Sequence, residues 1–242
     1  MTIITSKDNH KIKKARKLLI KKYRQDSYLI EGWHLFEEAL VSRQPIRQVF
    51  VLEEYVDRLP AELEVVVVTQ EVLKSLSEVP SPQGIIAEVL FPTLPKLEIN
   101  QGRWLLLEDV QDPGNVGTMI RTADAAGLTG VILTSKAADI YNQKTLRSMQ
   151  GSHFHLPVYR LAIKDLFDQV HVPVLATTLS ERSVDYRGFS SQDFLLVMGN
   201  EGQGISSLVE ECADHLLHIP MLGQAESLNV AVACGIVLFR LL

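Results

Sequence analysis

The segment LLLEDVQDPGNVGTMIRTADAAG, residues 105–127, predicts the fold class of this chain. Its apolar beginning is typical of a buried strand, and its later residues have the apolar spacing of an amphipathic helix. Between them, the Asp-Pro-Gly-Asn sequence predicts a tight turn with a positive φ. A strand that runs through such a loop into a helix is the building unit of α/β proteins with a mainly parallel sheet.

Two side chains of this segment are candidates for function, and each also has a purely structural explanation. Asn115 follows the turn, where its side chain can cap the helix. Arg121 lies about two turns into the helix, where it can pair with Asp124 or Glu108. From this segment alone, both explanations stay open.

The same alternation continues through the second half of the chain. Apolar runs predict buried strands of a mostly parallel sheet, and helical patterns lie between several of them. The predicted strands are residues 104–107, 131–134, 174–177, 194–198 and 216–219, and the predicted helices are 116–126, 142–149, 205–213 and 228–241. In such a sheet, ligand chemistry is expected where the strands end in glycine-rich loops.

The first ninety or so residues form a separate pattern. Pro92, Pro95 and the polar residues 100–102 divide the chain near residue 100. Before them, the sequence predicts a helix at residues 11–23 that leads through residues 28–32 to a second helix at 33–42, and then strands at 48–52, 65–69 and 84–90. We therefore predict two domains: a small α/β domain over residues 1–95 and a larger α/β domain over residues 103–242.

The composition excludes several classes of protein. With 242 residues, 46% of them apolar, the chain can bury a real core and is not disordered. The apolar run at residues 228–239 is shorter than the about 20 residues of a membrane span, and the N-terminus lacks the apolar stretch of a signal peptide. The two cysteines show neither zinc-site nor disulfide spacing. We expect a soluble cytoplasmic protein without a metal.

The charge is distributed unevenly. The net charge is −5, but residues 1–24 contain nine Lys and Arg against one acid and carry +8, so the remainder carries −13. A basic arm on an acidic body is typical of a chain whose end meets nucleic-acid phosphates. A solvated helix face is the alternative explanation for the same residues.

The segment FLLVMGNEGQGIS, residues 194–206, predicts a strand followed by a ligand-binding loop. Its glycines let backbone N–H groups approach a ligand, but the G-x-x-G-x-G spacing matches neither the dinucleotide fingerprint nor the phosphate loop. Glu201 would repel a pyrophosphate, so a cationic ligand such as a sulfonium, or a ribose, suits this loop better.

The segment HIPMLGQAESLNVAVACGIVLF, residues 218–239, predicts a strand end, a loop and the last helix. Ser227 and Asn229 lie where this helix begins. Ser227 can be explained as its cap. Asn229, two residues later, is less easily explained by capping alone.

Together, the three segments resemble the three motifs of the SpoU (TrmH-like) RNA 2′-O-ribose methyltransferases, a family of the SPOUT superfamily. The first matches N-x-G-x-x-x-R and the second G-x-E-x-x-G, while the third matches I-P-M-x-G-x-x-x-S-L-N-V from Ile219 to Val230. The matched positions in the first two are Asn115, Gly117, Arg121, Gly199, Glu201 and Gly204. The stretches ITSKDNHKIKKARKL, FEEAL and SPQGIIAEV resemble the family's N-terminal substrate-binding domain, which is related to small ribosomal RNA-binding proteins.

The resemblance implies a SPOUT-type C-terminal domain with a trefoil knot, a homodimer, and S-adenosylmethionine as cofactor. It implies that the cofactor lies bent in the knotted loops and is held mostly by backbone groups. The residues expected to hold it are Thr178, Leu179, Gly199, Asn200, Glu201, Gly202, Ile219, Met221, Ser227 and Leu228.

The resemblance also implies the catalytic residues. Arg121 is expected to act near the partner's cofactor. A guanidinium stays protonated in proteins, so Arg121 is interpreted as gripping an RNA phosphate and stabilising the 2′-oxyanion rather than as the base. Asn115 and Glu201 would orient the ribose and Arg121, while Ser227 and Asn229 would arrange the acceptor. Histidines 153 and 155 are too remote from the motifs to be chosen as the base, and His218 borders the third motif.

The predicted function is therefore S-adenosylmethionine-dependent methylation of a ribose 2′-hydroxyl in structured RNA. Ribosomal RNA, in particular that of the large subunit, is favoured because the N-terminal domain resembles those of rRNA-modifying relatives, and transfer RNA is the alternative substrate. A non-catalytic RNA-binding protein is the alternative from another class, and a nicotinamide oxidoreductase is disfavoured by the glycine spacing and by Glu201. The nucleotide and the general base are left open.

Overall fold

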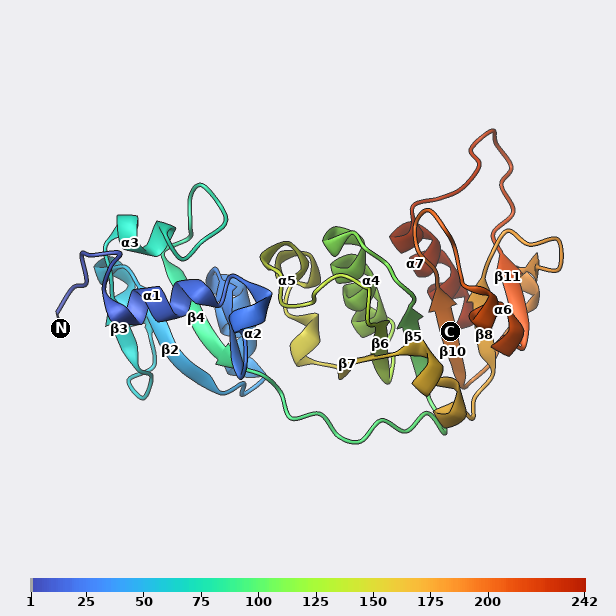
Figure 1. The fold of residues 1–242 in the computed structure, drawn as a ribbon, viewed down its shortest axis with the longest axis horizontal. Coiled ribbons are helices and arrows are strands. Elements are labelled where there is room, and N and C mark those ends of the chain that lie inside the picture. Colours follow the sequence, from blue (N-terminus) through green and yellow to red (C-terminus); the bar gives the residue numbers. More distant parts are fainter. Residues whose placement is uncertain (1) are drawn as a thin grey trace. The chain divides into compact units, whose positions relative to one another are not determined.

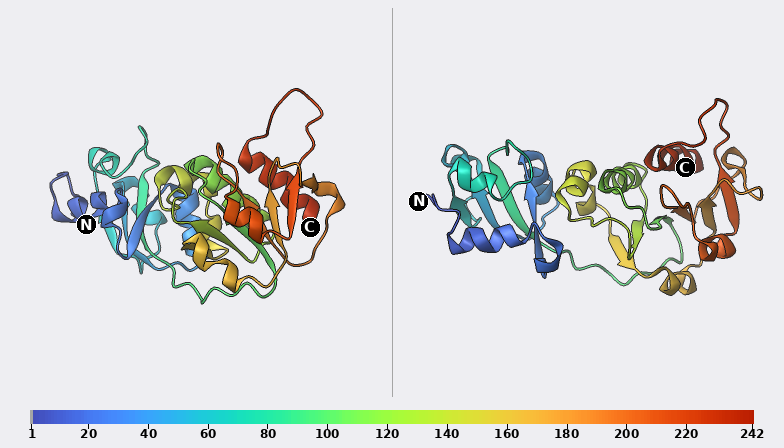
Figure 2. Two further views of the ribbon diagram at one scale, coloured as in Figure 1. Left: turned by 45° about the vertical axis from the view of Figure 1, so that its right-hand side comes forward. Right: turned by 45° about the horizontal axis from the view of Figure 1, so that its top comes forward.

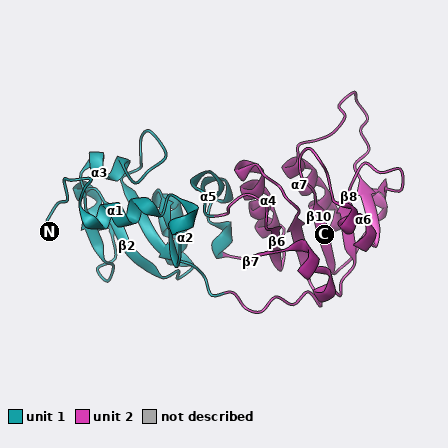
Figure 3. Cartoon of the chain, viewed as in Figure 1, with its two compact units in different colours: residues 1–93, 141–154 teal, residues 94–140, 155–242 magenta. Residues whose placement is uncertain are grey.

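The computed structural model describes residues 2–242, which form two compact units (Figure 3). Unit 1 holds the residues up to Thr93 together with Tyr141–Phe154, and unit 2 holds Leu94–Ile140 and His155–Leu242. Within residues 2–242, no helix is both long and apolar enough to cross a membrane.

Unit 1 is a sheet covered by helices, with the strand order β1-β4-β2-β3 (Figure 1). β4 pairs antiparallel with β1 and β2, and β3 pairs parallel with β2. The strands are β1 (Ser27–Glu31), β2 (Ile46–Val51), β3 (Val65–Val67) and β4 (Ile85–Leu90). The α-helices are α1 (His10–Lys17), α2 (Trp33–Val41), α3 (Gln70–Lys74) and α5 (Gln143–Met149), and the 3-10 helices are η1 (Lys21–Tyr23), η2 (Glu53–Arg58) and η3 (Ser152–Phe154).

The first helix is shorter than the predicted residues 11–23. α1 ends at Lys17, and Ile20 is already extended, with φ −104° and ψ 121°. Leu18 is still buried in the core of unit 1 with Ile12, whereas Ile20 is 53% exposed. The helix therefore ends where its apolar face would leave the core.

Residues 141–154 belong to unit 1, although their neighbours in the sequence belong to unit 2. The side chain of Gln143 donates a hydrogen bond of 2.8 Å to the carbonyl of Leu29 in β1, and Leu146 and Met149 are fully buried. The helix predicted at 142–149 is confirmed, but the sequence pattern does not reveal which strand it packs against. The predicted domain limits, 1–95 and 103–242, stay a prediction.

Unit 2 is built on a parallel sheet with the strand order β7-β6-β5-β10-β8-β11-β9. Every neighbouring pair in this order is parallel, which confirms the predicted sheet. The strands are β5 (Arg103–Leu107), β6 (Gly130–Thr134), β7 (Val158–Leu161), β8 (Val174–Thr177), β9 (Val184–Asp185), β10 (Phe194–Met198) and β11 (His215–His218). β8 and β10 have the predicted bounds, whereas the short β7 and β9 were not predicted.

The helices α4 (Pro113–Ala125) and α7 (Val230–Leu241) of unit 2 lie next to the candidate site. They pack beside each other, as Figure 1 and Figure 2 both show. The other helices are α6 (Ser207–Cys212), η4 (Ile163–Asp165), η5 (Phe167–Gln169) and η6 (Tyr186–Gly188). Since parallel strands end at the same edge of a sheet, the loops after β5, β8, β10 and β11 open on the same edge. That the chain is knotted at this edge stays a prediction.

Candidate active site

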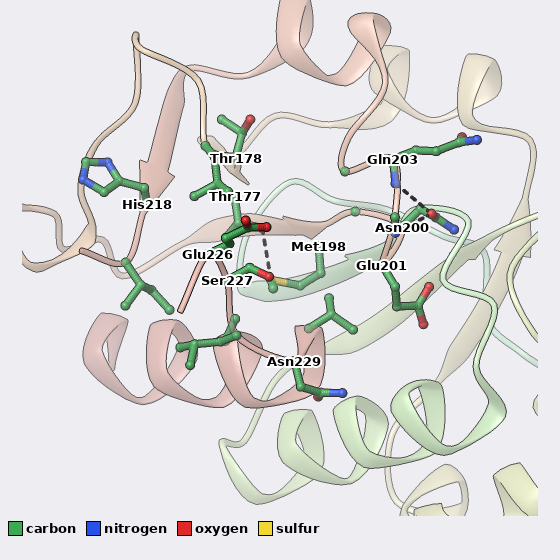
Figure 4. Close-up of a pocket in the computed structure, with 18 of the residues that line it drawn as sticks. Thr177, Thr178, Met198, Asn200, Glu201, Gln203, His218, Glu226, Ser227 and Asn229 are labelled. Carbon is green, nitrogen blue, oxygen red and sulfur yellow. Dashed lines mark hydrogen bonds between the residues drawn. The ribbon is translucent and has the colours of Figure 1, made fainter. Parts of the chain in front are cut away.

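A pocket of about 700 Å³ lies at this edge of unit 2, where β8, β10 and β11 end and α7 begins (Figure 4). Its volume is in the usual range of small-molecule sites, roughly 300–1,000 Å³. All the residues predicted to hold the cofactor line it: Thr178, Leu179, Gly199, Asn200, Glu201, Gly202, Ile219, Met221, Ser227 and Leu228. The structure therefore gathers the loops after β8, β10 and β11 around one cavity.

The predicted catalytic residues are only partly in the pocket. Glu201, Ser227 and Asn229 line it, whereas Asn115 and Arg121 do not. Asn115 is nevertheless bonded to two of the lining residues. Its Nδ2 donates to Glu201 Oε1 at 3.1 Å, and its Oδ1 accepts from Asn229 Nδ2 at 3.0 Å. One side chain from each of the three motifs thus joins a continuous hydrogen-bonded chain.

The side chain of Asn115 is free to make these hydrogen bonds because it does not cap α4, so the purely structural explanation considered for it is wrong. Asp112 is the cap, and its side chain accepts a hydrogen bond of 2.9 Å from the Asn115 backbone N–H. Pro113 and Gly114 are already in the first helical turn, where proline is well tolerated. The predicted tight turn at 112–115 is wrong, and the positive φ of this loop is at Asp109, with 52°.

Glu201 is held by donors on both of its oxygens. Besides Asn115, the backbone N–H groups of Gln111 and Asp112 donate to it at 3.2 Å each. Partial burial works to raise the pKa of Glu201, but the hydrogen bonds from Asn115 and the backbone outweigh it and leave the pKa lowered. Glu201 is therefore an ionised hydrogen-bond acceptor, and a poor candidate for the base that takes the ribose proton.

The side-chain amide of Asn229 makes two kinds of contact, one through its oxygen and one through its nitrogen. Its Oδ1 accepts from the N–H groups of Ala231 and Val232 at 2.9 and 3.3 Å and so caps α7, while its Nδ2 reaches Asn115. The interpretation of Ser227 as the cap of this helix is wrong, since the cap is Asn229 and Ser227 lines the pocket.

Replacing Asn229 with aspartate separates these two kinds of contact. The carboxylate still caps α7, so we expect the midpoint of thermal unfolding to change little. It cannot donate to Asn115, so methyl transfer should fall roughly tenfold, the effect of a lost hydrogen bond of about 1.4 kcal/mol. Asn229→Ala is the matched control, because it also loses the cap and should cost about 1 kcal/mol of stability. Equal stability losses in the two variants would contradict this assignment.

The glycine-rich loop after β10 is closed by its own backbone. Asn200 and Gly204 exchange two backbone hydrogen bonds of 2.9 Å, and Gly204 has a φ of 71°. A Cβ on Gly199 would lie 2.3 Å from the carbonyl carbon of Gly204. The closure of the loop itself therefore requires a glycine at position 199, and the approach of a ligand to this backbone stays a prediction.

The side chain of Arg121 makes no hydrogen bond or ion pair with any residue in the described range 2–242. The alternative pairings considered for it are both wrong. Asp124 pairs with His155 Nδ1 at 2.8 Å, and the buried Glu108 accepts from the Ser206 N–H at 2.9 Å. Arg121 is exposed on α4, with its guanidinium available to an external anion.

Sequence reasoning missed several lining residues. Glu226 lines the pocket from the loop before α7, and His218, which the sequence placed only at the border of the third motif, lines it with its Nδ1 at 3.1 Å from Ser183 Oγ. Glu226 directly precedes the Ser-Leu-Asn-Val of the third motif, which is the signal that could have found it. The other unpredicted lining residues are Thr177, Met198, Gln203, Gly204, Leu217, Val230 and Ala233.

Comparison with known families covers both halves of the chain. Residues 103–239 match the profile of the SpoU rRNA Methylase family, and residues 9–87 match the MRM3-like substrate binding domain. A relative from Bacillus subtilis, the 23S rRNA (guanosine(2553)-2'-O)-methyltransferase RlmP, is 42% identical over 251 residues, covering 100% of this chain and 99% of the relative.

Solved structures give the same result. An rRNA methyltransferase from Sinorhizobium meliloti with bound AdoMet superposes with a TM-score of 0.90 and 33% identity, covering 99% of this chain and 96% of the other. The SpoU methyltransferase AviRb from Streptomyces viridochromogenes, in complex with AdoMet, superposes with a TM-score of 0.83 and 27% identity, covering 96% of each chain.

Proposed function

Because this chain belongs to the SpoU rRNA methylase family, it is an S-adenosylmethionine-dependent RNA 2′-O-ribose methyltransferase, and we propose that its substrate is a guanosine of large-subunit ribosomal RNA. The observation that carries this proposal is the full-length match to the Bacillus subtilis enzyme, whose name gives that substrate. Ribosomal RNA is found in the cytoplasm, where we place the enzyme.

Mapping of ribose methylation tests the substrate. Purified enzyme and S-adenosylmethionine should add one 2′-O-methyl group to unmodified 23S rRNA, at the guanosine equivalent to that of the relative. Unmodified tRNA, incubated in parallel, should stay unmethylated. Methylation of tRNA alone would refute the ribosomal substrate and leave the family assignment intact.

The pocket suits S-adenosylmethionine, which is a cation at its sulfur. No Lys or Arg is among the residues that line the pocket, whereas two carboxylates are, those of Glu201 and Glu226. An anionic dinucleotide would be repelled there, and the oxidoreductase alternative is disfavoured for this reason. We propose that the loops after β8, β10 and β11 hold the cofactor, which supplies the methyl group when bound.

The catalytic roles follow from the hydrogen-bonded chain. Methyl transfer needs the ribose oxygen in line with the methyl group, so the acceptor must be held rigidly. We propose that Asn115 and Glu201 orient the ribose, and that Ser227 and Asn229 arrange the acceptor side of the pocket. Arg121 binds an RNA phosphate and stabilises the charge that develops on the 2′-oxygen.

We further propose that the enzyme works as a homodimer, with α7 in the interface. Three apolar side chains on α7 are exposed: Val232 by 52%, Ile236 by 37% and Phe239 by 57%. Exposed apolar residues grouped on one helix are typical of protein–protein interfaces. Arg121 is absent from the pocket of its own chain, which supports its action at the pocket of the partner.

Replacing Phe239 with aspartate should break this dimer. A charge in an apolar interface is desolvated without a partner, so we expect a monomer in size-exclusion chromatography with light scattering. Methyl transfer should fall at least tenfold, because the partner's Arg121 is lost. Val41→Asp is the matched control, an exposed apolar residue of unit 1 that is outside the proposed interface. A dimeric Phe239→Asp protein would remove α7 from the interface.

A further inference from the structure

The charge of the pocket is concentrated on few groups. Its titratable lining residues are Glu201, His218 and Glu226. Glu201 is turned toward the start of α4, where its oxygens are engaged by Asn115 and the backbone (Figure 4). His218 is within hydrogen-bond distance of Ser183. Glu226 is the remaining carboxylate, and it makes no hydrogen bond or ion pair with any residue from 2 to 242.

We infer that Glu226 recognises the sulfonium charge of S-adenosylmethionine and thereby distinguishes the cofactor from the neutral product S-adenosylhomocysteine. This inference rests on the pocket being the cofactor site, as proposed above. Glu226 is a specificity-determining residue in this assignment, not a proton acceptor.

The position of Glu226 in the chain supports the sulfonium rather than the amino group of the cofactor. The reactive methyl group must face the acceptor ribose, which is arranged by the chain Asn115–Glu201–Asn229. Glu226 enters the pocket from the loop that ends at Asn229, three residues later, and Ser227 follows it directly (Figure 4). The Glu226 carboxylate thus enters the pocket beside the acceptor residues Ser227 and Asn229, where the sulfonium would lose its positive charge.

Losing this charge is chemically useful for turnover. Transfer of the methyl group to the ribose oxygen, which gives up its proton, would leave the sulfur as a neutral thioether, and its attraction to the Glu226 carboxylate would end. Product affinity then falls relative to cofactor affinity, so S-adenosylhomocysteine leaves more readily. An amide in place of the carboxylate would bind both ligands alike, because it has no net charge to discriminate them.

Calorimetric titration of the full-length protein tests the inference without measuring activity. In Glu226→Gln, the dissociation constant for S-adenosylmethionine should rise about five-fold, the upper range for an exposed ion pair, whereas that for S-adenosylhomocysteine should stay within two-fold. Glu226→Asp should keep most of the discrimination because it keeps the charge. Glu211→Gln, which removes an exposed acid outside the pocket, should change neither affinity.

Two results would overturn the inference. Equal weakening of both ligands in Glu226→Gln would assign the carboxylate to the amino group or to the shape of the loop. Unchanged affinity for both would remove Glu226 from recognition altogether. A wild-type protein that binds neither ligand would instead overturn the pocket assignment itself, and this inference with it.

Discussion

Replacing Arg121 with alanine is expected to lower methyl transfer by about 100- to 1,000-fold, the usual effect of removing a group that stabilises a developing oxyanion. The affinity for S-adenosylmethionine should stay within a few-fold, because Arg121 is exposed on α4 and does not line the pocket of its own chain. Single-turnover kinetics and calorimetry measure the two quantities separately. Lost cofactor affinity with an unchanged turnover number would reverse the assignment.

A mixture of two inactive variants tests whether Arg121 acts across the dimer. Gly199→Val should lose cofactor binding, since even a Cβ at that position meets the backbone of Gly204. When this variant is mixed with Arg121→Ala and the subunits are exchanged, the mixed dimer contains one intact pocket faced by one intact arginine. Activity should reappear. If Arg121 acted within its own chain, every pocket of the mixed dimer would carry a defect, and the mixture would stay inactive.

The second large effect is expected from the basic arm. Replacing Lys13, Lys14, Lys17, Lys21 and Lys22 with glutamine should weaken RNA binding and flatten the dependence of log K on log salt by up to about three units, since each lost phosphate contact reduces the slope by roughly 0.7. All of these lysines are exposed on α1 and η1. The apparent KM for RNA should rise, whereas cofactor affinity should not change.

The structure refines this experiment. Lys13 also pairs with Asp8 at 2.9 Å, and Lys17 and Lys22 both lie over the ring of Tyr23. The same positions replaced with arginine form the matched control, because the charge and the contacts to the ring are kept. Filter binding across a salt series should then show the wild-type slope for the arginine variant. An unchanged slope in the glutamine variant would mean that this segment is a solvated helix face.

The sheet of unit 2 was largely predictable, and the reason is its burial. β8 and β10 are buried almost throughout, so their residues are continuously apolar and their bounds could be read from the sequence. β9 is only two residues long and β7 carries the exposed Arg160, so neither has such a run. The packing of residues 141–154 with unit 1 depends on contacts such as Gln143 to Leu29, which leave no local signal.

The sequence predicted which residues form the site better than it predicted which hydrogen bonds their side chains make. The motifs name Asn115 and Asn229, but local rules gave Asn115 the cap that Asp112 makes and gave Ser227 the cap that Asn229 makes. Capping propensity describes single residues and cannot choose between Asp112 and Asn115, which are both good candidates in one loop. The bond between Asn115 and Asn229 joins residues 114 positions apart, so only the closed sheet brings them together.

The assignment of residues 141–154 to unit 1 has a consequence for synthesis on the ribosome. The sheet of unit 1 is complete at Leu90, but β1 receives its last packing partner only with α5, about sixty residues later. At elongation rates of about 5–20 residues per second, the nascent unit therefore waits several seconds with part of its apolar surface uncovered. During that interval Tyr28, which packs against Tyr141 and His153 in the finished protein, is open to chaperones. Premature release of the chain would leave an aggregation-prone fragment rather than a finished domain.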